Sequence, residues 1–328
     1  MSRAKRSRRP QLPKLPKLHL QLVRTLPAFA PRPAFERTDS RIDPILSLAF
    51  VPGTTDIITI GRFGLQRFAL DRDEPVWSVA ADGHLGSAIA LSPDGERLFT
   101  IGNDDRLVER DAYTGVLRWS WAERLHHTTS IAFSRDGNDL LWSGSSVPGN
   151  PSGFSVPAVD LYDTTTMARR WRWEGRDWRS SHGAVFVPLG VAAAQSNGQI
   201  VILDRASGLI AGGLVHGGRA LRASRDGRTM IFSDEFLVVL RNNLVVGQAP
   251  MTSELAAIDP EGRHAVIAPY FQTDLYIVWF DPVGVCAQVE LADKDLDSIS
   301  NVACSDRGLV AAGTNGGHTY VYELTSLQ

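Results

Sequence analysis

The sequence offers few residues whose types and spacing could perform catalysis. The adjacent residues His126 and His127 would point to opposite faces of an extended chain, and no cluster of further metal ligands accompanies them. No Gly-x-Ser-x-Gly motif marks a hydrolase nucleophile. We therefore expect no catalytic residue, no metal and no cofactor. The alternative is a hydrolase or lactonase-like enzyme, whose scattered catalytic residues would leave no local motif.

Arginine and tryptophan occur together in the irregular segment 174–183, and these residue types most often anchor protein interfaces. Two further stretches, 122–128 and 144–157, also depart from the surrounding pattern, and residues 144–154 are too rich in Gly and Pro to predict a strand. The alternative is a variable solvated loop in which Trp178 folds back on the scaffold. The predicted partner-binding residues are Arg124, His126, Arg176, Asp177, Trp178, Arg179 and His182.

The charge is distributed unevenly along the chain. Residues 1–35 contain nine Lys or Arg and no Asp or Glu, although the whole chain has a net charge of −2. A disordered basic tail over residues 1–17 could contact nucleic acid, an anionic surface or an acidic partner, or could serve only solubility. The residues predicted to make this electrostatic contact are Arg3, Lys5, Arg6, Arg8 and Arg9.

Composition predicts a soluble protein with a sizeable core, because 43% of the residues are hydrophobic and no apolar run reaches the roughly 18 residues of a membrane helix. Residues 18–29 lack the continuous apolar stretch of a secretory signal. Cys286 and Cys304 lie in apolar segments, which favours small buried residues over a disulfide or a redox pair. We expect a cytoplasmic protein that is a monomer within a larger complex.

The elements that must position these residues repeat along the chain. Seven times a short apolar stretch leads into a Gly-containing turn and a second apolar stretch, most clearly over residues 88–100. Successive turn glycines are 35 to 53 residues apart, the spacing of four-stranded propeller blades. These glycines are Gly53, Gly95, Gly137, Gly190, Gly227, Gly262 and Gly308. The sequence therefore predicts an all-β, seven-bladed β-propeller of four-stranded antiparallel blades, forming one domain over residues 18–328.

The second repeat resembles a WD-repeat. It begins with Gly83-His84, contains the turn Ser92-Pro93-Asp94-Gly95, and ends with Arg110-Asp111, where Arg110 stands in place of the usual Trp. The stretch from Asp111 to Trp119 is similar to the turn and docking Trp of quinoprotein-type propellers. The chain thus resembles a diverged WD-repeat or quinoprotein-like propeller over residues 45–324. The resemblance implies the fold and says little about function, since quinone-dependent dehydrogenation would imply more blades and a calcium-binding carboxylate site.

The last repeat supplies only three strands, over residues 300–305, 309–312 and 318–324. Leu18, Leu20 and Leu22 alternate with other residues, which predicts a strand with one buried face. We expect residues 18–25 to supply the fourth strand of the last blade and to close the ring by removing two exposed edges. The alternative is that this stretch is a linker.

Five of the eight tryptophans fall where the outer strands of the blades should lie. Their wide rings would separate neighbouring blades at the rim of the propeller and bury apolar area there. They are Trp77, Trp119, Trp121, Trp171 and Trp173.

In such a blade, the loops between strands two and three and between one blade and the next share one face of the ring. The three irregular segments all map to that face. We expect a non-catalytic, WD-like propeller that acts as a protein–protein interaction scaffold and binds a protein or peptide there. The alternatives are an enzyme with its site at the axial mouth, and a nucleic-acid-associated factor that uses the basic tail.

Overall fold

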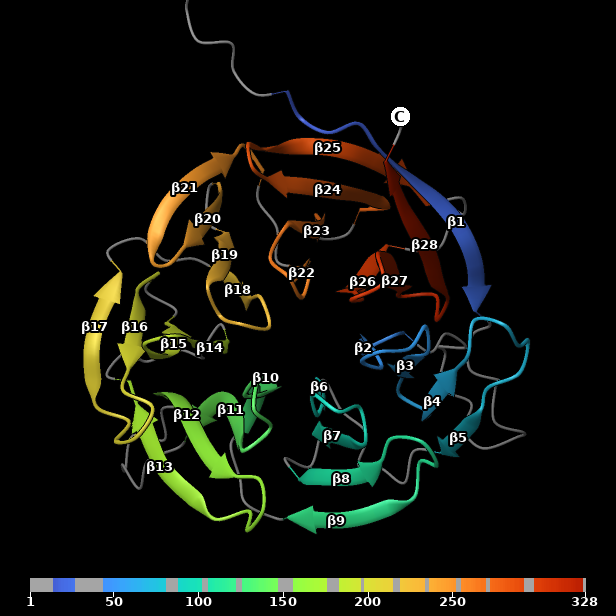
Figure 1. The fold of residues 1–328 in the computed structure, drawn as a ribbon. Helices are drawn as coiled ribbons and strands as arrows, with labels where there is room; N and C mark the ends of the chain where they lie inside the picture. Colours follow the sequence, from blue (N-terminus) through green and yellow to red (C-terminus); the bar gives the residue numbers. More distant parts are fainter. Residues whose placement is uncertain are drawn as a thin grey trace, which may run out of the picture.

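Twenty-eight strands form seven four-stranded antiparallel sheets in a ring, so the protein is a seven-bladed β-propeller (Figure 1). The described part of the chain contains no helix. The structure is a computed structural model, and it describes residues 14–26, 44–80, 88–101, 106–121, 126–146, 156–175, 183–195, 198–214, 219–233, 236–251, 255–269, 272–291 and 298–326.

Each of the first six blades uses four consecutive strands, ordered from the axis outward. Blades 1 and 2 are β2 (Ser47–Phe50), β3 (Ile57–Ile60), β4 (Gly64–Phe68), β5 (Trp77–Ala80), and β6 (Ala88–Leu91), β7 (Arg97–Ile101), β8 (Leu107–Asp111), β9 (Leu117–Trp121). Blades 3 and 4 are β10 (His126–Phe133), β11 (Asp139–Ser146), β12 (Val156–Asp163), β13 (Arg169–Glu174), and β14 (Ala184–Val187), β15 (Gly190–Ala194), β16 (Ile200–Leu203), β17 (Ile210–Leu214). Blades 5 and 6 are β18 (Arg219–Ala223), β19 (Thr229–Ser233), β20 (Leu237–Arg241), β21 (Leu244–Ala249), and β22 (Leu255–Ile258), β23 (His264–Ala268), β24 (Asp274–Phe280), β25 (Val283–Glu290).

Blade 7 joins the two ends of the described chain. It consists of β26 (Ile299–Cys304), β27 (Leu309–Thr314), β28 (Thr319–Ser326) and, as its outer strand, β1 (Leu18–Leu26). The pairing of β1 with β28 is antiparallel and shifts register between Leu22 and Arg24. The predicted alternation ends at this bulge: Leu20 and Leu26, on either side of it, are buried, whereas Leu22, directly before it, is exposed.

The repeated turns form because glycine permits a left-handed backbone. All seven turn glycines predicted from the sequence have φ between +69° and +142°. In blade 3 the Ser134 hydroxyl donates to Asp136 at 2.6 Å and accepts from the amide of Asp139 at 2.9 Å. The corresponding Ser and Asp side chains of blades 2 and 5 make the same contacts. The turns of blades 2, 3 and 5 are thus fixed by their own side chains and position the first two strands of their blades.

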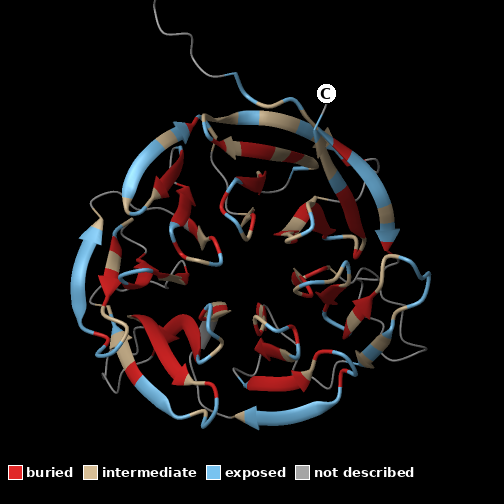
Figure 2. Ribbon diagram, in the orientation of Figure 1, coloured by how far each residue is buried: buried red, intermediate tan, exposed pale blue. Residues whose placement is uncertain are grey.

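The core lies between the blades. Buried side chains fill the second and third strands, while the outer strands form an exposed rim (Figure 2). A typical cluster joins Phe99 and Leu107 of blade 2 to Leu140 and Trp142 of blade 3. Because every interface of this kind needs the next blade, no blade can bury its apolar face alone.

Two of the rim tryptophans dock on the turn of the following blade. Trp77 donates to the carbonyl of Ala112 at 3.2 Å, and Trp171 donates to the carbonyl of Arg205 at 2.8 Å. Their rings lie against Gly115 and Gly208, where an added Cβ would approach the ring atoms to 2.9 and 2.7 Å. A side chain at either glycine would therefore displace the tryptophan.

The other three rim tryptophans lie on outer strands as expected, but Trp119 does not wedge blades apart. Its side chain is 63% exposed and stacks on Trp121, with ring centroids 5.8 Å apart. The corresponding turn of blade 3 carries Met167 at φ +54° in the position of the glycine. Without a glycine there is no flat surface on which a ring can dock.

Candidate functional site

The ring has two unlike faces. The turns between strands one and two and between strands three and four lie on one face, which we call the turn face. The connections between strands two and three and between successive blades lie on the other, which we call the connection face. A ligand or partner can approach either face or the axial channel between them.

Most of the residues predicted to bind a partner lie outside the described residues. This holds for Arg124, Arg176, Asp177, Trp178, Arg179 and His182. His126 is the first residue of β10 and is paired with Ser145, and its side chain is not described. The tail residues Arg3, Lys5, Arg6, Arg8 and Arg9 are also outside the described part. These assignments stay predictions.

Blade 3 is extended toward the connection face. Strands β11 and β12 each have eight residues, whereas β7 and β8, which begin and end at the corresponding turns of blade 2, have five. Three additional residues correspond to roughly 10 Å of strand. Residues 144–146, for which the sequence predicted no strand, belong to β11 and pair with 156–158. The Gly and Ser residues fit a strand here because neighbouring strands bury Ser145 and Ser146.

The axial channel is a second candidate site. A cavity of about 380 Å³ is lined by residues from the first strands of all seven blades, and it continues into the opening on the turn face. Most lining residues are small or apolar. The polar ones include Ser47, Thr129, Ser130, Asn301 and Arg222.

Arg222 occupies a channel position that is alanine in most other blades. This position lies two residues before the first residue of the turn, which is Ser224 in blade 5. The same position in blades 1, 2, 3, 6 and 7 is Ala49, Ala90, Ala132, Ala257 and Ala303. Strand β18 shifts register between Arg219 and Arg222, and Ala220 within this shift has φ +54°. Bulges of this kind redirect side chains, and the left-handed alanine carries a cost in strain.

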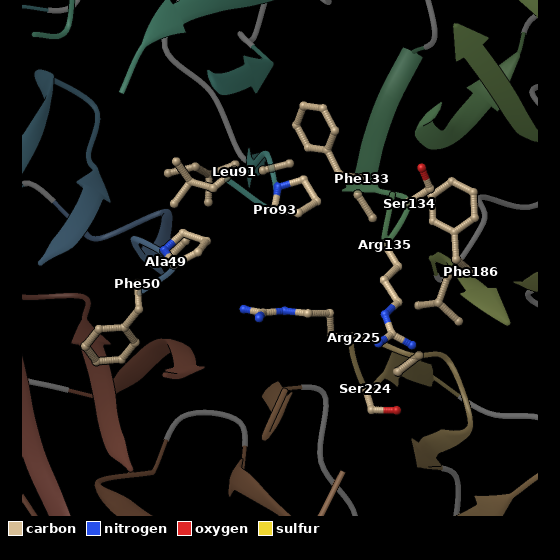
Figure 3. A pocket seen from close by; sticks show the side chains of 16 residues that line it. Ala49, Phe50, Leu91, Pro93, Phe133, Ser134, Arg135, Phe186, Ser224 and Arg225 are labelled. Atoms are coloured by element: carbon tan, nitrogen blue, oxygen red, sulfur yellow. The ribbon is translucent and has the colours of Figure 1, made fainter. Parts of the chain in front are cut away.

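The opening on the turn face carries two further arginines. Arg135 and Arg225 occupy the second position of their turns, where blades 1, 2 and 6 have Pro52, Pro93 and Pro260. Both line the opening, together with Phe133 and Phe186 (Figure 3). Comparison of this single position across the repeats is the sequence signal that identifies them. None of the three channel arginines was among the site residues predicted from the sequence.

The carboxylates of the turn face are held in ionised form by their own turns. Hydrogen bonding from the Ser134 hydroxyl, with the Arg205 guanidinium nearby, lowers the pKa of Asp136 to about 2. Arg205 also donates to Asp139 at 2.7 Å and so links blade 4 to blade 3. The buried charge of Asp139 therefore has a structural role at the interface of blades 3 and 4.

The cysteines are poorly suited to redox or nucleophilic chemistry. Both are free. Burial raises the pKa of Cys286 to about 11, and burial with the nearby charge of Asp259 raises the pKa of Cys304 further. The thiolate is therefore disfavoured at either position. No group of three or more potential metal ligands occurs within the described segments.

His264 predicts how stability depends on pH. Its ring is buried and stacks on Trp279, with ring centroids 6.0 Å apart. Burial lowers the pKa of His264, which the charge of Asp259 partly opposes, whereas an unfolded histidine gains its proton near pH 6.5. The unfolded state therefore binds more protons below about pH 6.5, so this contribution to stability is complete above that pH and is lost as the pH falls.

Denaturant titrations between pH 7.5 and 5.5 test this expectation. The wild-type protein should lose more unfolding free energy on acidification than His264→Phe, which has no group to protonate. His19→Phe, at an exposed position of β1, should keep the wild-type dependence. Parallel profiles for the wild type and His264→Phe would show that His264 does not couple stability to pH.

Comparison of the sequence with protein-family models finds no match, and no curated protein matches it either. None of the described residues forms a helix of the length and apolarity required to cross a bilayer. The fold is that of WD-repeat and quinoprotein-like propellers, and propellers commonly bind proteins.

Proposed function

We propose that the protein is a diverged, WD-like propeller that acts as a non-catalytic scaffold and binds a protein or peptide through its connection face. The observation that supports the proposal is the extended β11–β12 hairpin. Its two strands have eight residues each, three more than the described strands β7 and β8 of blade 2, which corresponds to roughly 10 Å of strand. The propeller ring itself does not require this extension, since the second and third strands of blade 2 have only five residues each.

The chemistry of the neighbouring sequence fits the same face. The segments that connect blade 3 to the blades on either side contain Arg124, Arg176, Trp178 and Arg179. Interfaces use such side chains as anchors because one residue combines a large contact area with hydrogen-bond donors. The raised hairpin and these two segments would together form a partner site on blade 3, with Trp178 as its centre.

Under this proposal the protein works in the cytoplasm as a monomer within a larger complex. The basic residues of the tail would provide a second contact with an acidic partner or another anionic surface. That contact would depend on ionic strength, because counterions are released when opposite charges meet.

Trp178→Ala is expected to weaken partner binding by about 2 kcal/mol or more while unfolding free energy stays nearly unchanged. The matched control is Trp119→Ala, because Trp119 is 63% exposed on outer strand β9 of blade 2. Quantitative affinity purification would first identify proteins retained by the wild type and by Trp119→Ala but lost with Trp178→Ala. Titration with the purified partner would then measure the affinities.

Two results would contradict the proposal. If Trp178→Ala lowers stability as much as binding, Trp178 packs on the blade instead of anchoring a partner. If both tryptophan variants retain the same proteins with the same affinity, the partner site lies elsewhere on the ring.

A further inference from the structure

Arg222 is a cation in the channel without an anionic partner among the described residues. Its Nη1 atom donates to the carbonyl of Leu221 at 2.9 Å, and Arg222 makes no other hydrogen bond or ion pair with the described chain. Burial lowers the pKa of the guanidinium, and no described carboxylate counteracts this effect. A guanidinium has five N–H donors, so most of its hydrogen-bonding capacity is unused. Arg222 is half-buried, and a charge partly withdrawn from water in this way favours a counter-charge.

The same channel has two more arginines at its opening. The side chain of Arg225 extends into the opening, and the guanidinium of Arg135 points toward the side of the opening formed by blade 5 (Figure 3). Arg225 has a distant ion pair with Asp306, 3.6 Å between Nη2 and Oδ2. Arg135 forms no hydrogen bond or ion pair within the described structure, although its charge acts on Asp226. Like charges that share an opening repel each other unless an anion lies between them.

All charged side chains in the described lining of the channel are cationic. Three arginines contribute to the opening and the cavity behind it, and no Asp or Glu is among the described lining residues of either. Asp136 and Asp226 belong to the same turns as Arg135 and Arg225, but hydrogen bonds from Ser134 and Ser224 hold them within the turns. The described lining of the channel therefore carries three positive charges and no negative charge, which favours an anionic ligand.

We infer that the axial channel binds a small anionic molecule whose carboxylate or phosphate group pairs with Arg222 after entry between Arg135 and Arg225. A guanidinium binds both groups through two parallel hydrogen bonds. The volume of about 380 Å³ is that of a small-molecule site, not of a folded partner. The inference goes beyond the scaffold function and does not depend on it, because this site opens on the opposite face.

The channel wall is suited to the remainder of such a molecule. Alanines of five other blades line the same channel as Arg222, so much of the wall around it is apolar. The hydroxyls of Thr129 and Ser130 in blade 3 also line the channel, and both are hydrogen-bonded to the Ser143 hydroxyl. A short carbon skeleton with one terminal anionic group fits these surroundings better than a highly charged polymer.

Calorimetric titration at constant ionic strength tests the inference on the full-length protein. The probes are inorganic phosphate and succinate, with sodium chloride replacing them in the blank. We expect saturable binding of at least one probe, and its identity distinguishes a phosphate site from a carboxylate site. Arg222→Gln should weaken binding about tenfold or more, because a charge-assisted hydrogen bond is lost.

Two further variants keep the test decisive. Arg135→Gln combined with Arg225→Gln changes only exposed residues and should weaken the same binding by about threefold or more. Arg72→Gln removes one positive charge from an exposed position outside the channel and should leave the affinity unchanged. Trp178→Ala should also leave it unchanged, which separates this site from the proposed partner site.

The inference is overturned if neither probe binds saturably up to about 10 mM, a concentration that covers weak single-anion sites. It is equally overturned if a folded Arg222→Gln protein binds phosphate and succinate as tightly as the wild type. Loss of binding in Arg72→Gln as well would show a general charge effect and would also reject the channel as the site.

Discussion

A protein that lacks residues 1–26 is expected to unfold with roughly 3–6 kcal/mol less free energy than the full chain, because Leu20 and Leu26 each lose burial in the core. Leu20 packs among residues of blades 6 and 7, and Leu26 packs among residues of blades 7 and 1. Strand β1 thus contributes to both interfaces of its blade. A loss of this size is a large part of the stability of an ordinary folded domain.

The truncation also exposes the edge of β28, and an unpaired edge promotes association with other chains. Urea titration and size-exclusion chromatography would measure the two effects. The control removes only residues 1–13 and keeps Leu15, whose side chain lies against Gly284 of β25. Equal unfolding free energies for the two truncations would show that β1 does not hold the ring closed.

Point variants within β1 provide a finer comparison. Leu20→Ala should cost about 2 kcal/mol or more, because a buried leucine leaves a cavity. Leu22→Ala should cost little, since this leucine is 45% exposed. The sequence alone predicts the opposite for Leu22, which its alternating pattern assigns to the buried face. A register shift depends on the partner strand and leaves no mark in the pattern of β1 itself.

The fold could be predicted because its determinants are local and repeated. A glycine at positive φ lies in each turn, and a Ser-x-Asp contact fixes the turns of blades 2, 3 and 5, so the period of the turns reveals the blades. Which of the rim tryptophans dock on the next blade could not be predicted from the local sequence. Trp171 docks because blade 4 has Gly208, whereas Trp119 stays exposed because blade 3 has Met167. Whether a tryptophan docks is decided by a residue of the next blade.

The candidate sites differ in the same way between features that the local sequence determines and features that depend on other blades. Arg124 and Trp178 were selected for their residue types, and that choice depends on connections whose conformation the repeat does not determine. Arg135, Arg222 and Arg225 lie on the repeat itself, and their significance appears only when equivalent positions of all blades meet at one axis. An arginine where other blades have alanine or proline is a departure that alignment of the repeats can detect. The charge that these three residues create together requires the closed ring.

Gly190→Ala should destabilise the protein by about 2–6 kcal/mol, because overpacking and a strained φ act at the same residue. Gly190 has φ +142°, and an added Cβ would lie 2.0 Å from the carbonyl oxygen of Leu203. That oxygen belongs to the backbone of β16, so it cannot move without disturbing the pairing of β15 with β16. The clash can therefore be relieved only by a shift of the backbone, which disturbs the sheet.

Gly53→Ala is the matched control for this variant. It replaces the corresponding turn glycine of blade 1, at φ +73°, but an added Cβ would meet nothing within 4 Å. Only the left-handed backbone opposes alanine there, which costs about 1–2 kcal/mol. Urea titration of both variants separates the clash from the backbone term. If Gly190→Ala is no less stable than Gly53→Ala, blade 4 can shift its second and third strands apart, and the close packing of the two backbones is not what holds that blade together.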